Sequence, residues 1–277
     1  MDAPKRPLLR TLLYLIAGLY AVITLGPFLI SVATSLTRTQ DVDKLVEHGM
    51  IPPVPTLGNY TYLIQNGHFG LWTVNSLLVG VLTVAGEILF NSLAGYALAR
   101  IRFPGRQFLF WCVLATMMVP GVVLLVPQYI MLTRLGWVNS FQGIIVPYLS
   151  TAFGIFLMRQ FFITLPVELE EAARIDGLGR WGIFWRVMLP LSRSALVAQT
   201  IFAFLGSWNN FMWPFLVARS VDVFTLPVGL QSFKVQHYQF WNQVMAGSMF
   251  LSIPVIIIFL ILQRWFTRGI SLTGLKG

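Results

Sequence analysis

The chain has 277 residues, of which 56% are hydrophobic and only 10% charged, and its mean hydropathy is +0.74. Soluble domains carry roughly 25% charged residues, so this composition excludes an ordinary water-soluble fold. The formal net charge of +9 would suit a nucleic-acid binder, but the basic residues lie between long apolar segments rather than in one patch.

Long apolar segments follow one another along the whole chain. Five of them contain no Asp, Glu, Lys or Arg, and each exceeds the roughly 20 residues that cross a bilayer as a helix. A sixth segment has a single acid, Glu87, near its middle. We therefore predict an all-α integral membrane protein with six transmembrane helices in a single domain over residues 1–277. The expected spans are 11–34, 74–99, 107–132, 142–162, 194–217 and 243–264.

The basic residues indicate which loops face the cytoplasm. If the N-terminus is placed inside and six spans alternate, 14 basic residues lie inside and five outside. Cytoplasmic loops are enriched in Lys and Arg, so we expect both termini in the cytoplasm. The same bias explains the positive charge without a nucleic-acid partner, and we expect none.

Polar residues within the predicted spans are candidates for a solute path. An ionised Glu87 in the bilayer would cost several kcal/mol unless it is paired or hydrated, and Asn91 lies one turn further along the same helix face. The remaining candidates are Gln128, Trp208, Asn209 and Asn210, which combine an aromatic plane with amide donors and acceptors. For Glu87 and Asn209 the alternative role is an interhelical hydrogen bond.

The third predicted span holds Pro120 and Pro127, and the sixth holds Pro254. A proline in a membrane helix frees backbone carbonyls that neighbours or cavity water must satisfy. We expect kinks at these positions, which either line a path or are tolerated by packing.

The polar segment 163–192 separates the fourth and fifth predicted spans and faces the cytoplasm in this topology. Pro166 and the three glutamates after it are typical of the first turn of a helix. Apolar residues between Leu165 and Ala173 recur at helical spacing and give this helix one apolar face. Asp176-Gly177 is expected to end it, because glycine readily adopts the left-handed conformation.

Charged residues occupy the other face of the predicted helix. Arg174 is spaced to pair with Glu170 or Glu171 on this face. A second amphipathic stretch from Trp181 to Met188 then leads back to the membrane.

This loop carries a motif at fixed spacing: Glu-Ala-Ala, three residues, Gly, nine residues, an aliphatic residue, one residue, and Leu-Pro. It resembles the EAA loop of binding-protein-dependent ABC importer permeases, with Val187 where isoleucine is commoner. Ala94–Arg100, Ser207–Asn209 and Thr273–Gly277 resemble the maltose-type sugar permeases, especially their smaller, six-span subunit. The resemblance extends over nearly the whole chain.

The resemblance implies a type I ABC importer permease (MetI-like) fold in the cytoplasmic (inner) membrane of a bacterium or archaeon. It implies a second permease subunit, expected to be a different chain, two ATP-binding subunits and an extracytoplasmic solute-binding protein. The residues it assigns to coupling with the ATPase are Glu171, Ala172, Ala173, Asp176, Gly177, Leu189 and Pro190. The expected function is to form half of the path for a sugar or oligosaccharide.

The residue types of the chain fit a transport subunit whose energy comes from ATP hydrolysis by another subunit. It contains no Gly-x4-Gly-Lys-Ser/Thr loop for phosphates and no cluster spaced for a metal, so we expect no enzymatic activity and no bound cofactor. ATP and Mg²⁺ would be used by the partner subunits. The alternatives are the same fold importing glycerol phosphate, a polyol or a peptide, or a non-ABC channel or membrane enzyme. A channel needs no docking loop, and an intramembrane enzyme needs more than the lone acid Glu87.

Overall fold

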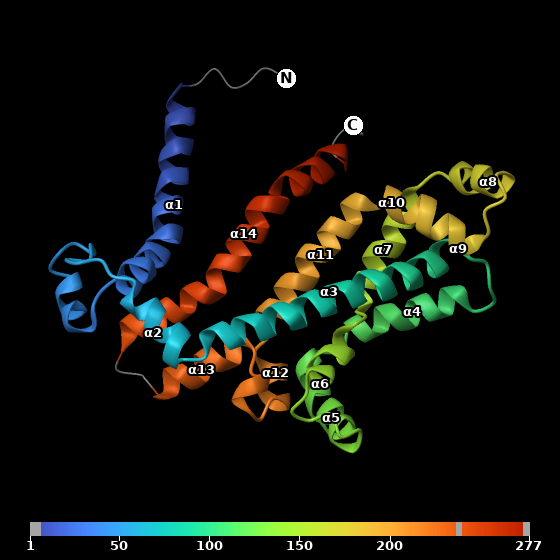
Figure 1. Ribbon diagram of the computed structural model, residues 1–277. Helices are drawn as coiled ribbons and strands as arrows, with labels where there is room; N and C mark the ends of the chain where they lie inside the picture. Colours follow the sequence, from blue (N-terminus) through green and yellow to red (C-terminus); the bar gives the residue numbers. More distant parts are fainter. Residues whose placement is uncertain (1–6, 237–239, 274–277) are drawn as a thin grey trace. The chain divides into compact units, whose positions relative to one another are not determined.

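The computed structural model describes residues 7–236 and 240–273, and every regular element among them is a helix (Figure 1). The chain forms two compact units. One comprises Met1–Gly70 and Leu230–Phe250, and the other comprises Leu71–Gly229 and Leu251–Gly277.

Four helical segments of the described chain are long and apolar enough to cross a membrane: Arg10–Ser35, Phe69–Arg100, Phe141–Thr164 and Trp241–Ile261. Two further pairs of helices pass the same test together but are sharply bent, Arg106–Met117 with Gly121–Arg134 and Arg180–Leu191 with Arg193–Trp208. The total is six if each bent pair crosses once. The all-helical multi-pass membrane fold expected from the sequence is confirmed.

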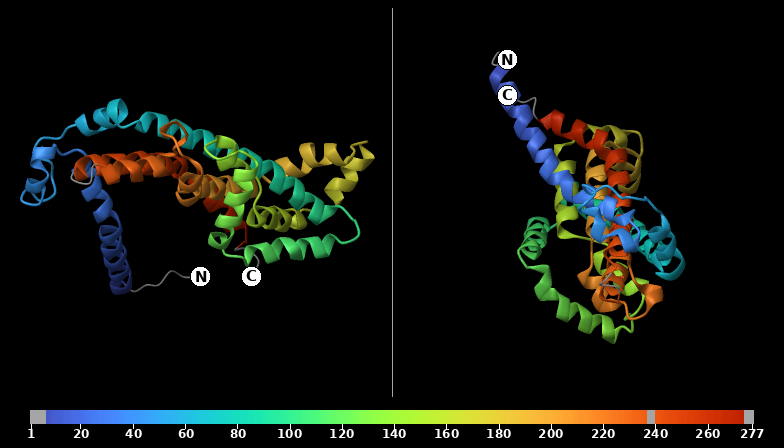
Figure 2. Two further views of the ribbon diagram at one scale, coloured as in Figure 1. Left: turned by 90° about the horizontal axis from the view of Figure 1, so that it is seen from below. Right: turned by 90° about the vertical axis from the view of Figure 1, so that its left-hand side faces the viewer.

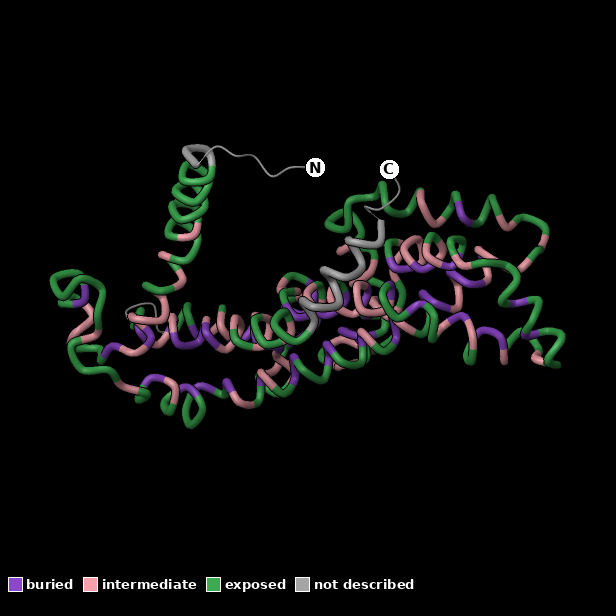
Figure 3. The backbone as a smooth tube through the Cα atoms, turned by 90° about the horizontal axis from the view of Figure 1, so that it is seen from above, coloured by how far each residue is buried: buried purple, intermediate pink, exposed green. Residues whose placement is uncertain are grey.

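The first unit contains α1 (Pro7–Ser35) and α2 (Gly58–Asn66), joined by two short 3₁₀ turns. Figure 3 shows α1 exposed along most of its length. Its exposed side chains are largely apolar, among them Leu15, at 65%, and Ile23, at 64%. An apolar helix of this length needs lipid or another subunit around it.

Two buried asparagines organise the polar centre of the first unit. The Asn59 amide donates to the carbonyls of Ser35 (2.7 Å) and Thr37 (2.9 Å), at the end of α1 where carbonyls lack helical partners. Asn242, which is fully buried, donates to Asn59 Oδ1 at 2.9 Å and to the hydroxyl of Thr39 at 3.0 Å. These bonds fix the chain that leaves α1.

The second unit holds most of the chain. It includes most of α3 (Phe69–Arg100), the start of α13 (Leu226–Gln236) and the later part of α14 (Trp241–Thr273). Its other helices are α4 (Arg106–Met117), α5 (Gly121–Arg134), α6 (Phe141–Ile145), α7 (Ala152–Thr164), α8 (Glu168–Ile175), α9 (Arg180–Ile183), α10 (Leu189–Leu191), α11 (Arg193–Trp208) and α12 (Met212–Val217).

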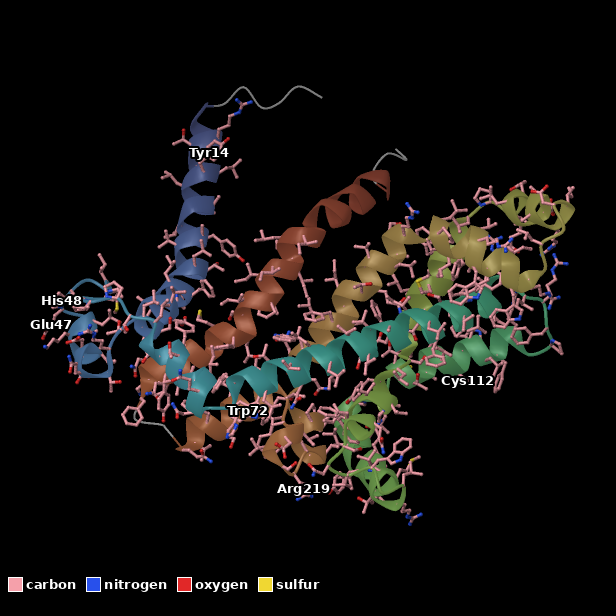
Figure 4. All side chains as sticks on the ribbon, viewed as in Figure 1. Tyr14, Glu47, His48, Trp72, Cys112 and Arg219 are labelled. Carbon is pink, nitrogen blue, oxygen red and sulfur yellow. The ribbon has the colours of Figure 1, made fainter. Side chains whose placement is uncertain are left out.

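The connection between α12 and α13 is tied to α3 within this unit. The indole Nε1 of Trp72, labelled in Figure 4, donates to the carbonyl of Val221 at 3.2 Å. One turn along α3, the Asn75 amide donates to the carbonyls of Asp222 (2.8 Å) and Phe224 (2.9 Å). The polar backbone of this connection is thereby satisfied by the helix beside it.

The segment predicted as a span over 107–132 is sharply kinked. The segment consists of α4 and α5, which meet at an angle of 101°. The break lies at Pro120, whose missing N–H and ring prevent the helix from continuing, whereas Pro127 is accommodated inside α5. With 12 residues, α4 is about 18 Å long, well short of the roughly 30 Å hydrocarbon core.

Two other predicted spans are interrupted by polar residues that bond to the backbone. Over 142–162 the chain forms α6, a 3₁₀ turn and then α7, whose N-terminus is capped by Thr151 accepting from the N–H of Gly154 at 3.2 Å. Over 194–217, α11 stops at Trp208 and α12 begins at Met212. Asn and Thr side chains compete for backbone groups in this way and favour helix ends.

Candidate functional site

The motif loop folds around the short helix α8, which begins just after Pro166 and Val167. Gly177 follows its end with φ +84°, the left-handed conformation expected from the sequence. The N–H of Gly177 donates to Arg174 O (3.0 Å) and that of Leu178 to Ala173 O (2.9 Å). This pair of bonds is a Schellman motif, which satisfies the last carbonyls and reverses the chain.

A buried ion pair fixes α8 to the end of α3. Glu170 is 2% exposed, and its Oε1 lies 3.3 Å from Nε of Arg100. The Arg100 guanidinium directs its hydrogen bonds to the carbonyls of Phe162 and Leu165, which are the open end of α7 and the residue after it. Arg174 adds the pairing expected from its spacing, with Nη2 3.4 Å from Glu170 Oε2. One acid and one arginine therefore join three helices at this loop.

The two alanines of the motif face opposite environments. Ala173 is 5% exposed and packs in a buried apolar cluster with Tyr96, Phe162, Phe184 and Met188. Ala173 therefore packs within the chain's own core. Ala172 is exposed beside Glu171, and Ile175, at the end of the same helix, is 87% exposed.

The second half of the motif widens into a π-helical turn over Phe184–Met188, after α9. The N–H of Leu189 donates to the carbonyl of Phe184, five residues back. Pro190 has no N–H and its ring would clash with the carbonyl of Arg186, which accounts for the wider turn. Leu189 is partly buried against the cluster described above, whereas Pro190 is exposed.

A cavity of about 240 Å³ lies among the helices of the second unit. It is lined by Val79, Thr83, Glu87, Ile144, Tyr148, Thr151, Phe153, Phe202, Ala203, Gly206, Ser207, Asn210 and Pro214. The lining combines aromatic rings with hydroxyl and amide groups and a single carboxylate, and no basic residue is part of it.

Glu87 is held at this cavity by a small polar network. Its Oε2 accepts from the hydroxyl of Thr151 at 3.1 Å and from the Asn91 amide at 3.3 Å. Asn91 is fully buried, and its Oδ1 accepts from the Ser150 hydroxyl (2.9 Å) and the Thr151 N–H (3.0 Å). Gln199 on α11 donates to the backbone carbonyl of Glu87 at 2.7 Å. The network joins α3, α7 and α11 and fixes the carboxylate.

The other predicted path residues separate into two groups. Asn210 lines the cavity with Glu87, and Asn91 supports that carboxylate from behind. Trp208 is buried against Phe204 with its Nε1 donating to Leu251 O at 2.9 Å, and exposed Asn209 bonds to Leu205 O. Neither lines the cavity, and nor does Gln128 on α5. The Trp208 bond joins α11 to α14, whereas the Asn209 bond stays at the end of its own helix.

Several residues at these sites had no signal strong enough to single them out in the sequence. Tyr148, Thr151 and Ser207 reach the cavity, and only Thr151, a polar residue at the start of an apolar run, fits a helix-cap pattern. Arg100 entered the sequence analysis only as a basic residue and as the end of the Ala94–Arg100 segment, with no partner predicted for it. Its partner Glu170 lies seventy residues further along the chain, a separation that local spacing rules do not cover.

The structure is that of a multi-pass membrane protein whose second unit carries the Glu-Ala-Ala motif loop. The chain belongs to the family described as "Binding-protein-dependent transport system inner membrane component", whose model matches residues 91–272. It is therefore a transmembrane permease subunit of a binding-protein-dependent importer. The matched region contains the motif loop and the cavity-lining residues from Ile144 to Pro214.

Individual relatives are similar over most or all of the chain. An arabinooligosaccharides transport system permease protein, AraQ, of Halalkalibacterium halodurans is 36% identical, with 100% of both chains covered. AraQ of Bacillus subtilis is 40% identical over 82% of this chain and 81% of its own. The sn-glycerol-3-phosphate transport system permease protein UgpE of Yersinia pestis is 38% identical over 73% of each chain.

Solved structures share the fold. A chain from the crystal structure of a bacterial ABC transporter involved in the import of the acidic polysaccharide alginate matches with a TM-score of 0.84 and 23% identity, covering 96% of this chain and 99% of that one. A second alginate ABC transporter structure, in complex with an alginate pentasaccharide-bound periplasmic protein, matches with a TM-score of 0.69 and 15% identity, covering 95% and 96%. The fold is that of an ABC importer permease, as expected from the motif.

Proposed function

We propose that the solute imported through this permease is a neutral sugar or oligosaccharide. The relative that covers the whole chain is named for arabinooligosaccharides. The cavity favours the same class, because its aromatic rings, hydroxyls and amides suit a hydroxyl-rich ligand. Glu87 can accept hydrogen bonds from sugar hydroxyls.

Glycerol phosphate is the second candidate, because UgpE is also a relative over 73% of the chain. The lining of the cavity speaks against it. A phosphate is usually bound by Arg, Lys or backbone N–H groups, whereas the only charged group in this lining is the carboxylate of Glu87. A fixed carboxylate repels an anionic solute.

We further propose that the loop from Glu171 to Pro190 couples the permease to an ATP-binding subunit. The arrangement of α8 supports this role: its inner face is anchored by Glu170 and Ala173, while Glu171, Ala172 and Ile175 are exposed. A helix held this firmly transmits a displacement to α3 and α7 as a rigid lever. With the loop in the cytoplasm, both termini are cytoplasmic as well, in agreement with the distribution of basic residues.

The complete importer in this proposal contains a second, different permease chain, two ATP-binding subunits that hydrolyse ATP with Mg²⁺, and an extracytoplasmic solute-binding protein. This chain contributes half of the path, with Glu87 and Asn210 at its wall and Asn91 holding the Glu87 carboxylate. Asp176, Gly177, Leu189 and Pro190 shape the loop and hold its exit angle.

Co-purification and uptake measured together test the proposal. The tagged chain, expressed with its neighbouring genes, should retain an ATP-binding subunit and a second permease, and should support ATP-dependent uptake of a radiolabelled arabino-oligosaccharide. Glycerol phosphate should neither be taken up nor compete. Uptake of glycerol phosphate alone would contradict the sugar assignment, and the absence of an ATP-binding subunit would contradict the coupling role.

A further inference from the structure

A second cavity, of about 800 Å³, lies between α8 and the turn that joins α3 to α4. Figure 2 shows this turn, in green, and the α8–α9 region, in yellow, at the same end of the second unit. The charged residues in its wall are five arginines and two glutamates, a formal excess of three positive charges. They are Arg100, Arg102, Arg106, Arg174 and Arg180, with Glu170 and Glu171.

The positive charges of this cavity are only partly neutralised. Arg100 and Arg174 share the buried carboxylate of Glu170. Arg106 Nη1 reaches only two backbone carbonyls, both at 3.4 Å. Within residues 7–236 and 240–273, no hydrogen bond or ion pair engages the guanidinium group of Arg102 or of Arg180, and both residues are exposed. Three guanidinium groups at one cavity are therefore available to an anion.

An apolar surface adjoins the basic cavity. Arg102 and Arg106 also line a neighbouring hollow of about 380 Å³, together with Phe103 and Phe108. Phe108 is 71% exposed, and Trp111, one turn along the same helix, is 60% exposed. Phe108 and Trp111 form an apolar face on α4, which is the first half of a candidate membrane span. This face begins next to the arginines of the basic cavity. The combination of a basic cavity with an apolar helix face matches the two ends of a lipid.

We propose that this cavity binds an anionic phospholipid of the cytoplasmic leaflet, an assignment that rests on the loop orientation given under Proposed function. Arg102, Arg106 and Arg180 hold the phosphate, since guanidinium groups bind phosphate oxygens in bidentate fashion. The acyl chains follow Phe108 and Trp111 along α4. Basic pockets on the cytoplasmic side of membrane helices bind such headgroups. The lipid links α8 to the α3–α4 turn, so that the docking loop is positioned with respect to the membrane surface.

The test uses the full-length chain with its co-purifying subunits, and native mass spectrometry counts the lipids bound after titration with phosphatidylglycerol or phosphatidylcholine. The variant is Arg102→Gln with Arg180→Gln. The matched control is Arg38→Gln with Arg134→Gln, which removes the same charge from two exposed arginines elsewhere. Lipid binding is read on the mass of the permease chain itself, so the result stands whether or not the ATP-binding subunit is retained.

Wild type and control should bind phosphatidylglycerol in preference to phosphatidylcholine, and the Arg102/Arg180 variant should lose roughly tenfold or more of that affinity, as expected for two removed lipid-facing charges. Absence of the preference in wild type overturns the proposal, as does equal binding by the variant. If millimolar inorganic phosphate displaces bound phosphatidylglycerol as effectively as added lipid does, the cavity is a general anion site and the lipid assignment is wrong. If the Arg102/Arg180 variant loses the ATP-binding subunit but still binds phosphatidylglycerol, the arginines contact an acidic protein partner and the lipid assignment is wrong.

Discussion

Gly177 offers the sharpest test of how the motif loop works. Its φ of +84° is a conformation that L-residues rarely adopt, and a Cβ added there would meet nothing within 4 Å. A substitution at this position is therefore strained by the backbone and not by crowding. We predict that Gly177→Val abolishes or strongly reduces ATP-driven uptake while the protein still inserts in the membrane.

The size of the effect follows from the backbone strain. A non-glycine residue in this region costs about 1–3 kcal/mol, with a β-branched residue at the upper end, and about 1.4 kcal/mol corresponds to a tenfold change in an equilibrium. The loop can escape the strain only by changing φ, which breaks the bond from Leu178 N–H to Ala173 O. Chain reversal after α8 is then lost, and the two halves of the motif no longer hold their relative angle.

The assay is uptake by proteoliposomes or cells at matched amounts of membrane-inserted protein. Gly177→Asn should retain most activity because asparagine tolerates the left-handed conformation, and Gly177→Ala should be intermediate. The matched control is Gly179→Val, since Gly179 has φ −74° and equally open surroundings. Equal uptake by Gly177→Val and Gly179→Val would refute the reasoning.

Three further substitutions probe the packing and the cavity. Glu170→Ala leaves Arg100 without its buried partner and should destabilise the chain by about 3 kcal/mol or more, seen as a lower thermal unfolding midpoint; an unchanged midpoint contradicts the anchor. Gly95→Val places a Cβ 2.9 Å from the α7 backbone. It should destabilise the chain by about 1–3 kcal/mol and lower the midpoint. Gly70→Ala, in open space on the same helix, should leave the midpoint unchanged. Glu87→Gln keeps an acceptor for the polar network and should fold normally but lower sugar uptake several-fold, because charge-assisted hydrogen bonds are the stronger ones; wild-type uptake would remove the carboxylate from the path.

Local patterns predicted the docking loop well. The turn at Gly177, the helix before it and the pairing of Arg174 with Glu170 depend on residues at most a few positions apart. Such features follow from helical spacing and backbone preference, which the sequence displays directly. What each residue does in coupling stays a prediction.

How sharply each predicted span bends was harder to foresee. Hydropathy measures how apolar a segment is but not whether its helix continues, so kinks were expected equally at Pro120 and Pro127, and only the first breaks the helix. The same proline pattern includes Pro127, which α5 tolerates. Which proline breaks a membrane helix depends on whether neighbours satisfy the freed carbonyls, and that is a property of the tertiary structure.

The cavity also depends on long-range packing. Glu87 was identified as a costly charge in an apolar run, but its partner Thr151 lies 64 positions away. Trp208 and Asn209 were chosen for their chemistry, and the direction of their side chains sends one to Leu251 and the other to its own helix. A polar residue within a predicted span is a candidate for the solute path. Whether it lines the path depends on how its helix is rotated about its own axis.

The central claim is that the exposed face of α8 contacts an ATP-binding subunit, and site-specific crosslinking tests it most directly. Cys112, the single cysteine of the chain, is exposed on α4 (Figure 4) and is first replaced by serine. Single cysteines then replace Ile175, which is 87% exposed, buried Ala173 on the same helix, and Val46, which is 68% exposed between α1 and α2. With a short bifunctional maleimide, we predict an adduct with the ATP-binding subunit from Ile175→Cys and none from the other two. No adduct from Ile175→Cys in a complex that hydrolyses ATP, or an equal adduct from Val46→Cys, would contradict the account.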